Sequence, residues 1–352
     1  MSEAAAHIDF ETRATVDLKK AGVYRYAESP DTGIICMSWR IGDTGPVQRW
    51  RPGDEDPYEL LAHVESGGRV VAHNAGFERT VWNAKVPKHW PRLQIEQQDC
   101  TMARGLALAL PASLDQLGRA LRTPIQKDKD GHALMMRMCK PRRMGEVYTT
   151  HRCSPCSGPA CKACGGTGQI RTVTGTVPVW WDDAERIERL QAYCDQDVET
   201  ETGVDASIPV LSPEERRVWE LDQRINDRGV MIDVPSVEVA LAVVTEALKR
   251  ADDRMWWLTD GEVKKCSEAA KIVKWLNDRG IPCQSVAKGE VEEIVLMTSV
   301  MGDDTAEEVI RLRRAAAKTS TAKFKAMLNS VCADGRVRGT LAYHGAATGR
   351  WA

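Results

Sequence analysis

The sequence predicts an α/β fold built on a mixed sheet, followed by a mainly helical region. Short alternating segments between turn residues come first, and strand patterns then alternate with helical patterns. Strands that precede a strand–helix alternation favour a mixed sheet over a purely parallel one. The last third of the chain contains long stretches with helical periodicity.

Length and composition limit the class of protein. The chain has 352 residues, enough for two domains with separate cores, and its apolar fraction of 43% is ordinary for a soluble protein. No apolar run reaches the ~18 residues of a membrane span, and we see no secretory signal, so we expect a cytoplasmic protein. The net charge of −2 does not indicate nucleic-acid binding, but an acidic metal site and a basic groove would cancel in that sum.

The first predicted strand places two carboxylates on one face. Ile8-Asp9-Phe10-Glu11-Thr12 alternates apolar and acidic residues, so Asp9 and Glu11 point the same way, about 7 Å apart. An edge strand with a solvated face would show the same alternation. Paired carboxylates also suit hard divalent cations, and acidic motifs further along the chain favour that interpretation.

The remaining strands of the predicted sheet lie between turn-rich segments. They cover residues 23–26, 34–41, 47–50 and 69–72, with a helix over 58–64 before the last of them. Helices are also predicted over 101–110 and 113–121.

The segment His73-Asn74-Ala75-Gly76-Phe77-Glu78 follows the last of these strands and opens a predicted helix. A carboxylate in the first helical turn beyond the carboxyl end of a strand lies where open α/β sheets build their sites. An asparagine cap with a glutamate at a helix start explains the same residues. Both interpretations stay open for Glu78 on this segment alone.

A basic segment over residues 127–143 comes next. Its cations could follow a phosphate backbone or simply face solvent. They are Lys127, Lys129, Arg137, Lys140, Arg142 and Arg143.

Four of the eleven cysteines form two closely spaced Cys-x-x-Cys knuckles. Clustered cysteines without a secretory signal indicate metal binding, and four thiolates complete the tetrahedral set of a structural zinc. A closed set leaves no open position for catalysis, and the short gap leaves open that His151 or another chain shares the site. Over about a dozen residues the knuckles resemble those of zinc-binding co-chaperones, and we treat 144–178 as an insertion. The predicted ligands are Cys153, Cys156, Cys161 and Cys164.

A strong helix is predicted over residues 180–204. Its apolar stripe consists of Ile187, Leu190, Cys194 and Val198. Tyr193 lies one turn before Asp197, so a phenol and a carboxylate face the same neighbour. A half-buried tyrosine beside a surface acid would give the same pattern.

Four acids from these segments, Asp9, Glu11, Glu78 and Asp197, would repel one another unless cations neutralised them. The three segments resemble the motifs of DEDD-type 3′→5′ exonucleases, specifically the proofreading domain of family A (pol I-like) DNA polymerases of phage and bacterial type. Tyr193 matches the tyrosine subclass, since the histidine subclass would have histidine where this chain has alanine at position 192. The chain departs from most relatives at Glu78, where they have aspartate.

The resemblance implies a ribonuclease H-like exonuclease domain over 1–208, which releases nucleoside 5′-monophosphates from DNA 3′ ends with two Mg²⁺ or Mn²⁺ ions. Asp9, Glu11 and Asp197 would hold the first ion, and Asp9 would bridge to the second. Glu78 would reach the second ion, and Tyr193 would orient the attacking water. The residues implied at the 3′-terminal nucleotide are Thr12, His73, Asn74 and Phe77.

The last third resembles the opening of the polymerase domain of the same family. Ser212-Pro-Glu-Glu215 has the features of a helix start, and the stretch over 219–233 carries the resemblance. Helices over 236–258, 269–276 and 306–331 would form a thumb-like region within 209–332, and 333–352 would form a β-hairpin at the start of a palm. The cations that would lie along duplex phosphates, or merely face solvent, are Arg311, Arg314, Lys318, Lys325 and Arg350.

The palm aspartates and the nucleotide-binding lysine helix of the family have no counterpart in this sequence. We therefore expect no polymerase activity from this chain alone, and we expect its partners to be single-stranded DNA 3′ ends, primer–template duplex and a separate palm–fingers chain. A phage-encoded protein would act in the host cytoplasm. Two alternatives stay open: an RNA-processing nuclease similar to ribonuclease D, and a non-catalytic DNA-binding half of a split polymerase.

Overall fold

The computed structural model describes residues 4–124, 128–154, 156, 159–165, 167–287, 289–316, 321–346 and 348–351. The chain divides into two compact units. Unit 1 comprises Met1–Val230 and Arg338–Ala352, and unit 2 comprises Met231–Val337. The sequence predicts domain boundaries after residues 208 and 332, whereas the contacts divide the chain at Val230 and Arg338.

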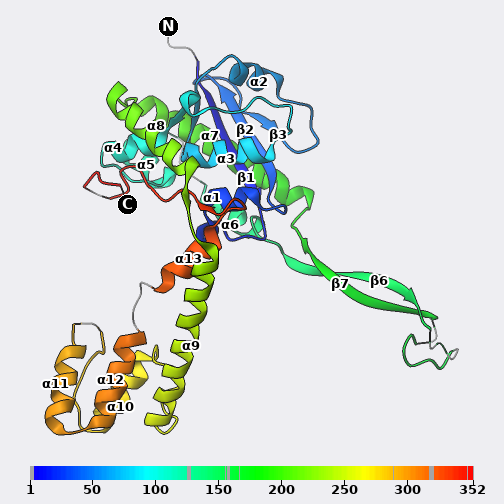
Figure 1. Ribbon diagram of the computed structural model, residues 1–352. Coiled ribbons are helices and arrows are strands. Elements are labelled where there is room, and N and C mark those ends of the chain that lie inside the picture. The colour runs from blue at the N-terminus through cyan, green and yellow to red at the C-terminus, as the bar shows by residue number, and fades with distance from the viewer. Residues whose placement is uncertain are drawn as a thin grey trace. The chain divides into compact units, whose positions relative to one another are not determined.

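A five-stranded sheet forms the centre of unit 1 (Figure 1). In chain order its strands are β1 (Ala6–Arg13), β2 (Gly33–Ile41), β3 (Gln48–Trp50), β4 (Val70–Ala72) and β5 (Gln98–Cys100). The spatial order is β3-β2-β1-β4-β5, antiparallel from β3 to β1 and parallel from β1 to β5. This confirms the mixed sheet. It also makes β1 the central strand, with Asp9 opposite Ser38 and Glu11 opposite Cys36 of β2.

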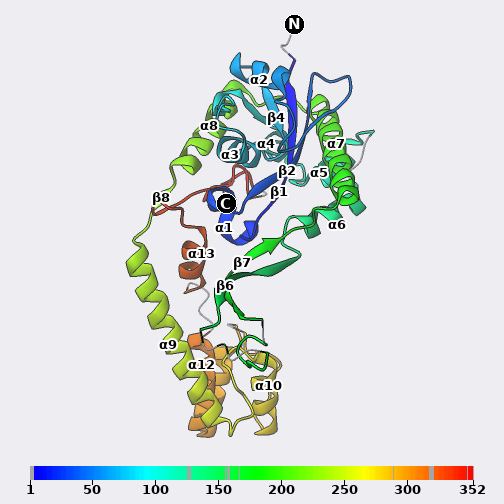
Figure 2. The ribbon, with the colours of Figure 1, turned by 90° about the vertical axis from the view of Figure 1, so that its right-hand side faces the viewer.

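Helices cover both faces of this sheet, as Figure 2 shows. The helices of unit 1 are α1 (Leu18–Glu28), α2 (Tyr58–Glu65), α3 (Ala75–Lys85), α4 (Thr101–Ala107), α5 (Leu114–Leu121), α6 (Lys129–Met138), α7 (Ala184–Ser207) and α8 (Pro213–Arg228), with a 3₁₀ turn, η1 (Ile95–Gln97). On the α3 side, Phe10 meets Trp82 edge to face in the main apolar core. On the other side, α7 packs Leu190 and Cys194 against β2. Alternate residues of β1 therefore face α3 and α7.

Two sequence predictions in unit 1 need correction. The strand predicted over 23–26 is helical and belongs to α1, which Asp17 caps and which Gly22 kinks at φ 72°. Tyr26 is buried from this helix and its hydroxyl contacts Thr12 of β1, so tertiary packing overrides the local β preference. The basic segment after residue 127 contains helix α6, capped by Asp128; Lys127 itself lies outside the described residues.

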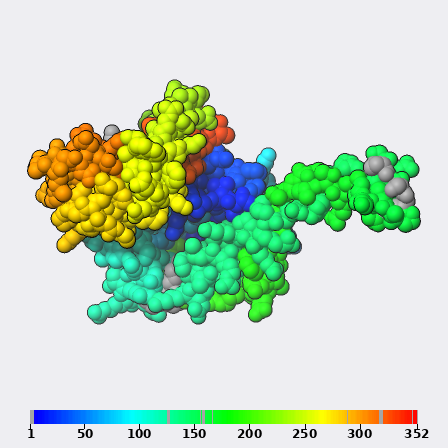
Figure 3. All heavy atoms as spheres, turned by 90° about the horizontal axis from the view of Figure 1, so that it is seen from below, coloured from blue at the N-terminus to red at the C-terminus, as the bar shows by residue number. Residues whose placement is uncertain are grey.

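The predicted insertion is a long β-hairpin. β6 (Arg143–Arg152) and β7 (Gln169–Val179) pair antiparallel, with a bulge beside Val147, and the cysteine cluster lies at their tip. Figure 3 shows this hairpin as an extension of unit 1. Most of its side chains are exposed, so it adds nothing to the core of the unit.

Unit 2 is helical. It contains α9 (Val234–Leu258), α10 (Ala269–Asp278), α11 (Val291–Met301), α12 (Asp304–Ala316) and α13 (Ala322–Ser330). Its core joins residues of α9, α10, α11 and α12, including Met255, Ile272, Ile294 and Val309. The helical character agrees with the prediction, but α11 was not predicted, and the stretch 306–331 holds two helices whose intervening residues 317–320 lie outside the described range.

The hairpin predicted over 333–352 is wrong. β9 (Arg336–Val337) pairs with β8 (Val230–Met231), and the described residues from Arg338 onward contain no strand. They bind α8 instead: the amide N–H of Leu341 donates to Asn226 at 3.0 Å, and the Tyr343 hydroxyl donates to Glu215 at 2.6 Å. None of the described helices combines the length and the apolar character needed to cross a membrane.

Candidate active site

Helix α7 lies against β1 and carries a buried polar stripe. Four of its buried residues follow one another at intervals of four, which places them on one flank of the helix: Tyr193, Asp197, Glu201 and Asp205. The apolar stripe predicted from the sequence runs beside it and packs into the core through Leu190 and Cys194. The two stripes together fix the rotation of α7 on the sheet, so its polar flank faces the carboxylates of β1.

The structure brings three of the predicted acids together. Asp9 and Glu11 of β1 and Asp197 of α7 each offer a carboxylate oxygen, and these oxygens lie within 4.8 Å of one another. Glu11 and Asp197 are buried, and Asp9 is half-buried. The Cys194 thiol donates to Asp9 Oδ2 at 3.2 Å, so the helix that carries Asp197 also holds Asp9.

Glu78 is the fourth predicted acid, in the first turn of α3 directly beyond β4. Its side chain is 4% exposed, and its Oε2 atom makes no hydrogen bond with any described residue. Burial, followed by the charge of Asp9, raises the pKa of Glu78 well above its usual range. A buried carboxylate oxygen without a donor is an unfavourable arrangement that a cation would relieve.

Asn74 does not cap this helix in the way the alternative interpretation requires. It occupies the N-cap position in a left-handed conformation, with φ 72°, and its side chain makes no capping hydrogen bond. A non-glycine residue in this region of φ is uncommon, although asparagine adopts it more readily than most residues.

Tyr193 is almost fully buried beside the three acids. Burial raises the pKa of its phenol most, and the charges of Asp197, Glu11 and Asp9 raise it further. The hydroxyl therefore keeps its proton and bonds to Asp197. The ring also abuts α6, because a Cβ atom added at Gly131 would lie 2.5 Å from Tyr193 Cδ2.

Sequence reasoning missed Glu201, a further buried acid beside this cluster. It is 2% exposed, and burial, then the charges of Glu78 and Asp9, raise the pKa of its carboxyl well above the usual range. Thr101 Oγ1 lies 3.4 Å from its Oε1 atom. The signal was present in the sequence, because the four-residue spacing of Tyr193 and Asp197 continues to Glu201.

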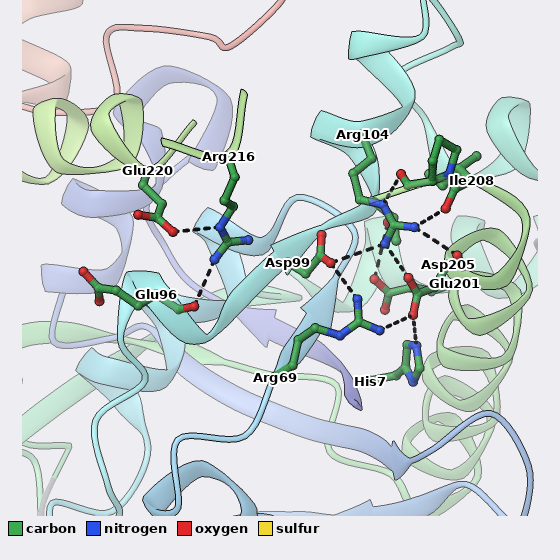
Figure 4. A network of polar contacts seen from close by, with 12 residues as sticks. His7, Arg69, Glu96, Asp99, Arg104, Glu201, Asp205, Ile208, Arg216 and Glu220 are labelled. Atoms are coloured by element: carbon green, nitrogen blue, oxygen red, sulfur yellow. Dashed lines mark hydrogen bonds and ion pairs between the residues drawn. The ribbon is translucent and has the colours of Figure 1, made fainter. Parts of the chain in front are cut away.

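The next acid of the stripe, Asp205, belongs to a different environment (Figure 4). His7 Nε2 donates to its Oδ2 at 3.1 Å, Arg69 donates to the same atom at 3.2 Å, and Arg104 donates to Oδ1. Burial opposes ionisation, but the bonds from His7 and Arg104 and the charges of Arg104 and Arg69 outweigh it and lower the pKa of Asp205. His7, Asp43 and Asp205 are close enough to hold a metal, but the two arginines already neutralise Asp205 and leave no role for a cation.

Three of the predicted nucleotide-contacting residues make specific contacts within unit 1. Thr12 Oγ1 lies 2.8 Å from the Tyr26 hydroxyl, and the Tyr26 ring lies 6.5 Å from that of Phe77. His73 is held by Thr101 Oγ1 at 3.0 Å and by the carbonyl of Ala112 at 2.8 Å. A cavity of about 230 Å³ is lined by Asn74 and Phe77 together with residues of α4, α8 and the segment 339–343.

The four cysteines at the tip of the hairpin form a compact cluster of free thiols. Cys153 and Cys161 have sulfurs 3.8 Å apart, and Cys156 and Cys164 have sulfurs 3.7 Å apart. A tetrahedron with Zn–S bonds of about 2.3 Å has edges of about 3.8 Å, so the spacing fits zinc and is far too long for disulfides. Among the described residues the ligand group consists of these cysteines and does not include His151.

The cations predicted along duplex phosphates are spread over several elements. Arg311 and Arg314 lie on α12, where they pair with Glu307 and Glu292, and Lys325 lies on α13. Lys318 lies outside the described residues. Arg350 is in the C-terminal segment of unit 1, where it donates to Thr348 at 3.1 Å. They therefore do not share one face of a single described helix.

No protein-family model matches the chain. It is 36% identical over 359 residues to a DNA polymerase of Bacillus phage SP02, an alignment that covers 98% of this chain and 49% of that protein. A solved structure, the POL domain of Pol1 from M. smegmatis in complex with DNA primer–template and dNTP, matches with a TM-score of 0.53 and 14% identity. That match covers 99% of this chain and 50% of the other. The chain is therefore homologous, along nearly its whole length, to about half of a phage DNA polymerase, and it has the fold of a comparable part of a Pol I polymerase structure.

Proposed function

We propose that this chain is the 3′→5′ proofreading exonuclease portion of a family A-like DNA polymerase. It would release nucleoside 5′-monophosphates from DNA 3′ ends with the help of two divalent cations. The observation that carries the proposal is the convergence of Asp9, Glu11 and Asp197 within 4.8 Å, with Glu78 buried beside them. Homology to a phage DNA polymerase supports DNA as the substrate.

The donor set fits Mg²⁺ or Mn²⁺, since both prefer carboxylate oxygens. Burial raises the pKa values of Glu78, Tyr193 and Cys194 most, and the charge of Asp9 raises all three further. This effect of Asp9 shows that the field at the site is negative. We assign Asp9, Glu11, Glu78 and Asp197 as the ligands. When bound, the two cations would supply an activated water and would stabilise the departing oxyanion.

The protein groups would position the reactants. The neutral Tyr193 hydroxyl, fixed by Asp197 and by the packing of α6 on its ring, would orient the attacking water. Thr12, His73, Asn74 and Phe77 would hold the 3′-terminal nucleotide, and the cavity beside Asn74 and Phe77 supports this assignment.

The outlying regions would serve binding. We assign Cys153, Cys156, Cys161 and Cys164 to a structural zinc, on the strength of their sulfur spacing. We assign the helices of unit 2 to a thumb-like domain, whose Arg311, Arg314 and Lys325 would contact phosphates of a primer–template. Arg350 of unit 1 is assigned to a separate phosphate contact.

The direct test is degradation of a 5′-labelled, 3′-recessed primer–template with Mg²⁺ or Mn²⁺. We expect stepwise shortening of the primer by the wild type, and none by Asp9→Ala/Glu11→Ala or in EDTA. Glu185→Ala is a matched control, because Glu185 is an exposed acid in the first turn of α7. Matched RNA primers test the ribonuclease alternative. A folded wild type that leaves single-stranded and recessed DNA intact would refute the proposal and favour a non-catalytic DNA-binding role.

A further inference from the structure

The hairpin of β6 and β7, residues 143–179, contributes no described residue to the candidate active site, and we call it the β-arm. Its paired strands of ten and eleven residues extend about 33 Å. Gly145 is the only buried residue of β6 and β7, so the paired strands have no core of their own. An isolated two-stranded hairpin is marginal in water, which indicates that this exposed ribbon serves an interaction.

The root of the β-arm is fixed to unit 1. The amide N–H of Arg142 donates to the carbonyl of Val179 at 2.8 Å, and the Arg142 guanidinium lies 5.1 Å from the centre of a Trp181 ring. Met138, just before the arm, and Trp181, just after it, both pack into the core beside α7. Both ends of the β-arm are therefore anchored to the core of unit 1.

The charged side chains of the β-arm are mostly cationic. It contains four cationic residues, Arg143, Arg152, Lys162 and Arg171, and one acid, Glu146. Within the described structure no carboxylate lies within 4.0 Å of the charged nitrogens of these four residues. Some arginines of unit 1 do have such partners, since Arg49 and Arg51 both pair with Glu188 of α7. Cations that the protein leaves without carboxylate partners are available to an external anion.

Two of these arginines share one face of the ribbon with an aromatic ring. Thr150 pairs with Arg171, Arg152 pairs with Gln169, and Tyr148 pairs with Val173, so alternate positions bring Tyr148, Arg152 and Arg171 together. The Arg171 guanidinium lies 4.3 Å from the centre of the Tyr148 ring, and Tyr148 is 42% exposed. The ring holds Arg171 in place while its N–H groups stay accessible.

We propose that this face of the β-arm binds duplex DNA. The major groove of B-DNA admits a two-stranded β-ribbon, and arginine and threonine side chains are common donors to phosphate. Arg152 and Arg171 favour a polyanion on this face, where the one acid, Glu146, bonds to the Tyr148 hydroxyl. The ribbon form favours a duplex over a flexible single strand. The inference rests on the proposed function only in taking DNA as the partner. It gives the arm a separate role, which is to hold the duplex behind the 3′ end.

The test measures equilibrium binding in a cleavage-inactive Asp9→Ala/Glu11→Ala background, so that the DNA stays intact. The probe is a fluorescent primer–template with about 30 base pairs, or roughly three helical turns. We compare Arg152→Glu/Arg171→Glu with Lys88→Glu/Arg92→Glu, which makes the same change in charge at two exposed positions between α3 and η1.

We expect the arm variant to bind the duplex roughly tenfold more weakly, with a salt slope lower by about 2, because two phosphate contacts are lost. Binding of a short single strand, and the melting temperature, should match those of the control variant. Equal duplex binding by both variants, or a loss confined to single strands or to RNA, would overturn the inference. An arm-dependent duplex affinity in a protein without nuclease activity would refute the proposed function and leave this inference standing.

Discussion

Two groups of buried acids lie along the same strand and helix of unit 1, and they differ in what surrounds them. The carboxylate cluster comprises Asp9, Glu11, Glu78 and Asp197. The arginine network comprises Asp99 and Asp205 with His7, Arg69 and Arg104 (Figure 4). Both groups use β1 and α7, and both take aspartates out of water.

The pKa shifts of the residues in and around each group indicate the sign of the local electric field. Beside the carboxylate cluster, burial and acidic charge raise the pKa values of Tyr193, Cys194 and Glu201. In the arginine network, bonds from His7 and Arg104 lower the pKa of Asp205 despite its burial. The first field is negative and the second is positive.

This difference separates a candidate metal site from a structural one. A buried acid costs folding energy unless it is paired, hydrogen-bonded or bound to a cation. The arginine network meets that requirement with its own side chains. The carboxylate cluster meets it best with divalent cations, so the two groups should respond in opposite ways to substitution.

The largest expected effect is the loss of catalysis on neutralising the carboxylate cluster. Asp197→Asn keeps the shape of the side chain but removes a ligand, and we expect kcat to fall by about 10³-fold, similar to the loss of one strong electrostatic stabiliser. The melting temperature without metal should not fall, since one of several repelling charges is gone. Glu185→Gln is the control. A variant with unchanged kcat would remove Asp197 from the site.

The next effect is the loss of stability on breaking the arginine network. Asp205→Asn leaves the buried Arg104 with only the longer pair to Asp99, at 3.5 Å. We expect the free energy of unfolding to fall by about 3 kcal/mol, measured by urea denaturation. A fall below about 1 kcal/mol would show that Asp205 and Arg104 do not form a buried, coupled pair.

The pH dependence of that loss has a definite sign. The folded-state pKa of Asp205 is lowered, so its stabilising contribution is fully present above the unfolded value of about 3.9 and disappears as the pH falls through the folded value. The stability difference between wild type and Asp205→Asn should therefore be constant from neutral pH to about pH 5 and shrink below about pH 4. A difference that grows on acidification would contradict the assignment.

A smaller effect is expected from the contact between α6 and Tyr193. Gly131→Ala would place a Cβ atom 2.5 Å from Tyr193 Cδ2 and 2.5 Å from Oδ2 of the capping Asp128, so the ring, the cap or the helix must shift. We expect a fall in kcat of roughly 10–100-fold without loss of any chemical group, because the phenol would be misplaced. Gly33→Ala is the matched control, since nothing lies within 4 Å of its added atom. Equal kcat values for the two variants would show that the position of Tyr193 is unimportant.

The smallest effect concerns the cysteine cluster, which lies at the tip of the β-arm and away from both groups of acids. Cys161→Ser should abolish stoichiometric zinc, measured by metal analysis, while the unfolding of unit 1 changes by no more than about 0.5 kcal/mol. Destabilisation as large as that of Asp205→Asn would show that the tip supports the core.

Two local signals in the sequence, joined by the resemblance to an exonuclease family, predict that Asp9, Glu11 and Asp197 lie together. The alternation around Asp9 and Glu11 and the spacing of Tyr193 and Asp197 each place two groups on one face, whatever the rest of the chain does. The arginine network depends on pairs of residues far apart in the sequence, such as Arg104 with Asp205. Such pairs produce no periodic pattern from which they could be predicted. The helix over 23–26 and the absence of a hairpin after Arg338 have the same cause, since distant contacts of Tyr26 and Leu341 decide the local structure.

The most direct test of the metal site is a count of bound Mn²⁺. Zinc-loaded wild type and Asp9→Asn/Glu11→Gln are titrated with Mn²⁺ in the presence of a DNA 3′ end that resists cleavage, and binding is followed by electron paramagnetic resonance. We predict two bound Mn²⁺ per wild-type chain and their loss in the folded variant. Equal stoichiometry in the two proteins, or no bound Mn²⁺ in the wild type, would contradict the assignment of these carboxylates to a metal-dependent exonuclease.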